Sequence, residues 1–111
     1  IIITNLITGV FLDLIDGAKP IISDLVNIAA LHNPDIKHLK TGKALGKNQF
    51  LTRYNSQNPS VNNILESCYD LAKQGQLTVE YEYDREVYVE LVEIFGINQV
   101  IQEGNKMLIS W

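Results

Sequence analysis

The sequence predicts an α+β protein, with helices first and a small antiparallel β-sheet after them. Two observations predict this order. Apolar residues recur at helical spacing as far as Gln74, and beyond Gly75 they alternate with polar residues, as in a strand with one wet face. With 111 residues, 46% of them hydrophobic, we expect a single domain spanning 1–111 with a core of its own.

Residues 1–33 are expected to form two apolar helices. The first covers 4–16, where Gly17 stands at a stop position, and the second begins at Pro20 and ends before Asn33. The first helix carries one apolar stripe made of Leu6, Ile7, Val10, Phe11, Leu14 and Ile15. Asp13 and Asp16 interrupt this stripe well short of the roughly 20 apolar residues that span a bilayer, so we expect a buried helix and no membrane partner. The two helices carry more apolar surface than a small core needs, which predicts a homodimer through them.

Residues 35–75 are expected to hold three further helices. Two short pieces fall near 35–45 and 47–55, and a longer helix covers 60–74. Gly75 is expected to end the longer helix in the left-handed conformation. Cys68 falls on the apolar side of that helix and is expected in the core.

Residues 77–111 are expected to be β-rich and acidic. A strand covers 77–84, and 99–103 and 106–111 form a hairpin around Gly104-Asn105. The segment 85–95 fits two structures. Asp84 as cap and Gly96 as stop favour a helix, whereas its β-branched and aromatic residues fit a strand. We favour the helix.

The segment 50–61 has the order of a helix-turn-helix. Leu51 and Tyr54 are the expected buried residues of its first helix, and Asn55 falls at the turn, where a left-handed conformation is needed. Capping and first-turn residues then lead into the second helix. Val61, Ile64 and Leu65 are expected to face the first helix.

This segment resembles the winged helix-turn-helix of GntR-type bacterial regulators. The resemblance covers about residues 50–77 and rests on Phe50, Leu51, Tyr54, Asn55, Ser56, Pro59, Ser60, Val61, Leu65, Gly75 and Leu77. The segment departs from the consensus in three ways: Asn55 replaces the usual turn glycine, the second helix is expected to be about one turn longer, and no effector domain is expected after it. The last two departures favour a looser relative. The resemblance implies a winged-helix-like fold, with the C-terminal hairpin as wing. It also implies a sequence-specific DNA-binding protein, either a transcriptional regulator or a plasmid or phage protein.

Charge is distributed unevenly along the chain. The net charge is −4, yet residues 36–65 contain no Asp or Glu and hold five of the nine basic residues. Local field rather than net charge decides whether a polyanion is attracted, because salt screens charges beyond about 10 Å. The acid-free stretch therefore predicts double-stranded DNA as the partner.

The predicted DNA contacts fall into two sets. Base contacts are expected from the start of the second helix, because Asn and Gln bond adenine edges and Ser bonds either donors or acceptors. These residues are Gln57, Asn58, Ser60, Asn62 and Asn63. Phosphate contacts are expected from Lys37, Lys40, Lys43, Lys47 and Arg53. The alternative is that the first set is a polar turn and the second a solvated face.

The acidic C-terminal part of the chain, residues 66–111, supports a different function. A protein-interaction module, such as a winged helix used for protein contacts or a small immunity-protein-like or antitoxin-like antagonist, would use it to meet or mimic a basic partner. The carboxylates concerned are Glu80, Glu82, Asp84, Glu86, Glu90 and Glu93.

No pattern in the sequence indicates an enzyme, a cofactor or a metal site. His32 and His38 lie six residues apart, which is not a ligand spacing on a helix, and we expect ordinary surface histidines. One cysteine forms no internal disulfide, which suits a reducing compartment and predicts a cytoplasmic protein.

Overall fold

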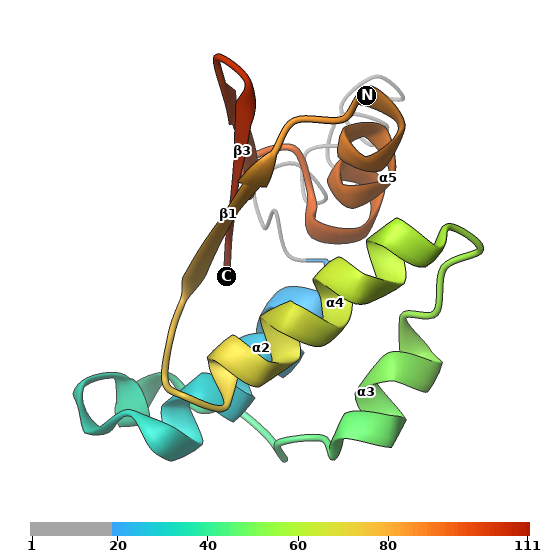
Figure 1. The fold of residues 1–111 in the computed structure, drawn as a ribbon. Helices are drawn as coiled ribbons and strands as arrows, with labels where there is room; N and C mark the ends of the chain where they lie inside the picture. The colour runs from blue at the N-terminus through green and yellow to red at the C-terminus, as the bar shows by residue number, and fades with distance from the viewer. Residues whose placement is uncertain (1–18) are drawn as a thin grey trace, which may run out of the picture.

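A computed structural model describes residues 19–111, which form a mixed α+β fold as predicted (Figure 1). The elements are α2 (Pro20–His32), the 3₁₀ helix η1 (Pro34–Leu39), α3 (Lys47–Arg53), α4 (Pro59–Ala72), β1 (Thr78–Glu82), α5 (Arg85–Phe95), β2 (Val100–Glu103) and β3 (Lys106–Ser110). The helix predicted for 4–16 lies outside the described residues.

Helix α4 lies at the centre of the core. Its side chains at spacings of four, three and four residues, Val61, Leu65, Cys68 and Ala72, have no exposed surface. The helix contacts α2, α3, α5 and β1. Asn58 caps its start, where the side chain accepts a hydrogen bond from the backbone N–H of Ser60 at 2.9 Å.

Helix α2 is confirmed and packs on α4. Ile21, Leu25 and Ile28 are buried in the same hydrophobic cluster as the stripe of α4. Because this face of α2 is covered within the chain, the homodimer predicted from residues 1–33 stays a prediction that rests mainly on residues outside the described part.

The short helix predicted for 35–45 is wrong in its length and type. A 3₁₀ helix ends at Leu39, and residues 40–46 have no regular structure. The buried side chain of Asn27 explains the change, because its Oδ1 accepts hydrogen bonds from the N–H groups of Thr41 (2.9 Å) and Gly42 (3.3 Å). A tertiary acceptor thus satisfies backbone donors that a helix would have used internally.

The sheet is antiparallel with the strand order β1-β3-β2. The predicted hairpin at Gly104-Asn105 is confirmed, and Gly104 has φ +61. Val79, Ile109 and Val100 share one row across the three strands and face the helices, whereas Glu80 and Glu82 are exposed on the other face.

Residues 85–95 form helix α5, so the strand alternative is wrong. The Asp84 carboxylate accepts a hydrogen bond from the N–H of Val87 at 3.1 Å, and Gly96 ends the helix with φ +97. Leu91 and Phe95 are fully buried.

The predicted left-handed Gly75 is confirmed with φ +82. It lies against Asn33, whose Nδ2 donates to the Gly75 carbonyl at 3.0 Å. Trp111 closes the same end of α4, since its indole N–H donates to the Gln76 carbonyl at 2.8 Å.

We predict that Gly75→Ala destabilises the protein by roughly 2–4 kcal/mol and Gly104→Ala by only about 1 kcal/mol. Both glycines have positive φ, but a Cβ at residue 75 would lie 2.9 Å from the Asn33 Cβ, whereas a Cβ at residue 104 would meet nothing within 4 Å. Urea unfolding of both variants measures the difference. Equal losses would contradict the close packing of Gly75 on Asn33.

Candidate nucleic-acid interface

The turn between α3 and α4 is held by side chains rather than by a left-handed residue. No non-glycine residue among 19–111 has a positive φ, so the left-handed conformation predicted for Asn55 is wrong. The side chain of Asn62 stabilises the turn instead. Its Oδ1 accepts a hydrogen bond from the N–H of Ser56 and its Nδ2 donates one to the Ser56 carbonyl, both at 2.7 Å. Phe50, not Leu51 or Tyr54, is the fully buried residue of α3.

The five predicted base-contact residues divide by their role in this turn. Asn58 and Asn62 hold the chain at the start of α4, so their amides are engaged within the protein. Gln57, Ser60 and Asn63 are exposed at the same end of α4. The structure therefore brings three exposed polar side chains together at the predicted recognition end.

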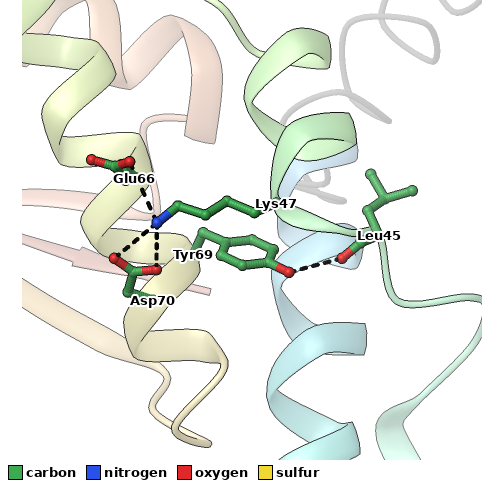
Figure 2. Close-up of polar contacts among 5 residues, drawn as sticks. All are labelled: Leu45, Lys47, Glu66, Tyr69 and Asp70. Carbon is green, nitrogen blue, oxygen red and sulfur yellow. Dashed lines mark hydrogen bonds and ion pairs between the residues drawn. The ribbon is translucent and has the colours of Figure 1, made fainter.

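Two of the five predicted phosphate contacts form ion pairs within the protein. Lys47 Nζ lies 3.1 Å from Asp70 Oδ1 and 3.4 Å from Glu66 Oε2, so it joins the start of α3 to the exposed face of α4 (Figure 2). These carboxylates raise the pKa of Lys47, with the hydrogen bond to Asp70 as the largest cause.

The second ion pair joins α3 to α2. Arg53 Nη1 lies 3.1 Å from Asp24 Oδ2, and this hydrogen bond is the main cause of a raised Arg53 pKa. The Tyr54 hydroxyl donates to the same carboxylate oxygen. Desolvation of the Tyr54 phenol and this hydrogen bond both raise the pKa of Tyr54.

The other three predicted phosphate contacts lie at the opposite end of α4. Lys37 belongs to η1, which begins beside Gly75 at the C-terminal end of α4, and Lys40 and Lys43 follow it (Figure 1). A helix of 14 residues is about 20 Å long, so these lysines are far from Ser60. The five basic residues do not gather on one surface beside the start of α4.

Carboxylates lie at the recognition end instead. The Ser56 hydroxyl donates to Glu90 of α5. A shallow hollow beside this contact is lined by the turn residues together with two carboxylates, Glu90 and Glu93, and two basic residues, Lys19 and Arg53. The sequence analysis assigned both glutamates to the acidic C-terminal part and did not predict that they lie beside the turn before α4. The helical alternative for 85–95 was the available signal, because it sets these residues on a turn of α5.

The exposed face of α4 is not cationic either. Ser60, Asn63, Glu66, Asp70 and Lys73 are exposed along the helix. Residues 36–65 contain no acidic residue, but the folded surface around them does. Asp24, Glu66 and Asp70 come from outside that stretch and pair with its basic side chains.

The cysteine and the two histidines lie where the sequence predicted them, in the core and on the surface. Cys68 is fully buried, and desolvation raises its pKa to about 12, so its sulfur stays a thiol at neutral pH. His32 and His38 are exposed. Among residues 19–111, no three His, Cys, Asp or Glu side chains are grouped so that they could hold a metal ion. None of the described helices is long and apolar enough to cross a membrane.

No protein-family model, curated protein or solved structure matches this chain. The GntR-type resemblance therefore stays a prediction that rests on residues 50–77.

We predict that Tyr54→Phe lowers the free energy of unfolding by about 1–2 kcal/mol at neutral pH, because it leaves the Asp24 carboxylate without this donor. The raised Tyr54 pKa makes this stabilisation complete below the ordinary tyrosine value of 10.0, and it is lost as the pH rises above that value. Denaturant unfolding at pH 7 and pH 10.5 measures both effects.

Arg53→Met is the matched control for Tyr54→Phe. It removes the other partner of Asp24, but the Arg53 side chain is 54% exposed, and we expect a smaller loss of stability. A Tyr54→Phe variant as stable as the wild type at pH 7 would disprove the assigned role of the hydroxyl.

Proposed function

We propose that this chain is a protein-interaction module built around a helix-turn-helix, rather than a sequence-specific DNA-binding protein. One observation carries the proposal: the Ser56 hydroxyl, just before α4, donates to Glu90. The hollow beside this contact is lined by Glu90 and Glu93 together with Lys19 and Arg53, and Arg53 is paired with Asp24. A helix that reads bases enters the major groove by this end, between two rows of phosphates.

The charges around α4 do not favour the binding of a DNA duplex. DNA-binding proteins gain most of their non-specific affinity by neutralising phosphates with Lys and Arg. Near α4, Lys47 and Arg53 are each paired with a carboxylate, and Glu66 and Asp70 lie on the face that would meet the groove. Salt screens charges only beyond about 10 Å, so carboxylates in direct contact with a docked duplex would keep their repulsion.

Exposed apolar side chains support a protein partner. Val89 of α5, Ile97 after it and Ile101 of β2 are 50%, 58% and 46% exposed. Protein interfaces combine such apolar contacts with a polar rim. The hollow beside Val89 is lined by three carboxylates, Glu86, Glu90 and Glu93, and by one basic residue, Arg85. A basic protein surface matches this combination of acidic and apolar groups.

The proposal includes a variant of the winged-helix arrangement. Helices α3 and α4 form the helix-turn-helix, and the β2–β3 hairpin takes the position of the wing. Support comes from the element order α3, α4, β1 and hairpin. The insertion of α5 between β1 and the hairpin distinguishes this chain from the simple wing, and it supplies the carboxylates at the start of α4.

DNA binding is the second candidate. The exposed side chains of Gln57, Ser60 and Asn63 at the start of α4 favour it, as does the exposure of Lys37, Lys40 and Lys43. These two groups lie at opposite ends of α4, so a duplex contacting both would lie along the helix rather than receive its end.

We predict that the purified chain does not bind double-stranded DNA at about 50 mM salt, and that cross-linking in the native host captures one stoichiometric protein partner. Fluorescence anisotropy with a labelled duplex pool measures the first result, and quantitative mass spectrometry the second. Carboxylates at the recognition end are the physical reason for both.

Two variants make the test decisive. Lys43→Glu reverses a charge that only the DNA hypothesis uses, and Glu90→Gln with Glu93→Gln removes the charges that oppose DNA. Salt-dependent duplex binding by the wild type that Lys43→Glu abolishes would overturn the proposal and establish the DNA-binding alternative.

A further inference from the structure

The two outer strands of the sheet, β1 and β2, each pair only with β3 in the described part of the chain, and the edge of interest is that of β1. The hydrogen bonds from Trp111 N–H to the Leu77 carbonyl (2.9 Å) and from Tyr83 N–H to the Asn105 carbonyl (2.7 Å) lie at the two ends of the β1–β3 ladder. In an antiparallel pair the bonded residues alternate, so the odd-numbered residues of β1 bond to β3. The N–H and C=O groups of Thr78, Glu80 and Glu82 therefore point away from β3.

No other strand among residues 19–111 pairs with that outer edge, and β1 lies at the border of the sheet (Figure 1). Resting on the proposed protein-binding function, we propose that the outer edge of β1 binds an extended, basic segment of the partner protein by strand addition. Main-chain hydrogen bonds to Thr78, Glu80 and Glu82 supply the docking, and side-chain charge supplies the selectivity.

The charges on β1 specify the partner. Glu80 and Glu82 are exposed on the outer face of the sheet, where Leu108 of β3 lies opposite Glu80 and Lys106 lies opposite Glu82. Glu80 is therefore the main charge offered to an added strand. A residue directly opposite Glu80 on an added strand has its Cβ about 5 Å away, so Lys or Arg there forms a cross-strand ion pair. On the other face, Tyr81 and Tyr83 are half-buried beside the core and meet the alternate residues of the partner. The matching segment alternates basic and apolar residues.

The same charges disfavour a second copy of this chain. Two β1 edges joined antiparallel about residue 80 place Glu80 opposite Glu80, and joined about residue 81 they place Glu80 opposite Glu82. Like charges directly opposite are destabilising, and outward charges are a common protection of strand edges. Residues 1–18 of the chain contain no Lys or Arg, so they do not supply a basic strand.

We predict that the blocked peptide Lys-Val-Lys-Val-Lys-Val binds the full chain and slows amide hydrogen exchange at Thr78, Glu80 and Glu82 at least tenfold. The amides of Val79 and Tyr81, already bonded to β3, change little. Nuclear magnetic resonance measures exchange with and without peptide. Slow exchange at Glu80 and Glu82 in the free protein would overturn the proposal, because the edge would already be covered.

Two methylated peptides separate strand addition from simple charge attraction. The lysine opposite Glu80 exchanges both main-chain bonds with it, so N-methylation of the lysine amides is expected to weaken binding at least tenfold. N-methylation of the valine amides leaves the same charge, modifies the far edge and is expected to change affinity less than threefold. Equal binding by both peptides would reduce the interaction to charge alone and overturn the proposal.

Variants of the chain test the same edge from the other side. Glu80→Pro removes one outward N–H and leaves the β3 ladder intact, so it is expected to weaken peptide binding tenfold or more. Glu80→Gln weakens binding less and lowers its salt dependence, whereas Glu103→Gln on β2, at the far edge of the sheet, is the matched control and leaves both unchanged. If Glu80→Pro does not fold, the methylated peptides still decide the matter.

The outcomes also separate this proposal from the proposed function. Capture of the same stoichiometric partner by wild type and by Glu80→Pro would overturn strand addition and leave a protein-binding function in place. Duplex binding that Lys43→Glu abolishes would overturn the protein-binding function.

Discussion

The packing of one apolar stripe of α4 holds four other elements, α2, α3, α5 and β1, around one helix. Val61, Leu65 and Cys68 have no exposed surface, and the helix that carries them contacts α2, α3, α5 and β1. Truncating a buried side chain of this size typically costs 2–5 kcal/mol, a large part of the stability of a small domain. The ends of α4 are held as well, by the Ser56–Glu90 contact at its start and by the Asn33–Gly75 hydrogen bond at its end.

This packing brings together charges that are distant in the sequence. Lys47 meets Asp70 because α3 packs on α4, and Arg53, the last residue of α3, meets Asp24 of α2. Such exposed pairs contribute little to stability. Their importance is the field that remains at the surface, since a paired lysine attracts a phosphate less than a free one. The balance between a protein partner and a nucleic-acid partner depends on these pairings.

Much of the fold follows from local signals. Gly75, Gly96 and Gly104 have the positive φ that their positions at helix ends and in a hairpin turn require, and Asp84 caps α5. Two local predictions, for Asn55 and for the segment 40–46, failed for the same reason. Asn55 does not take the left-handed conformation, since Asn62 satisfies the turn from the next helix, and the segment 40–46 is not helical because Asn27 accepts its backbone N–H groups. In both places a side chain from another element supplied the bond that local reasoning gave to the backbone.

The sequence by itself determined the helical and strand periods, the caps, the stops and the exposed polar residues at the start of α4, because those depend on neighbours within a few positions. It also identified the candidate residues Gln57, Ser60 and Asn63. Only the tertiary structure decided which carboxylates lie beside them and which strands form the edges of the sheet. Coulomb forces act through space over about 10 Å. Ser56 and Glu90 are 34 residues apart in the sequence, so no local pattern predicts their contact.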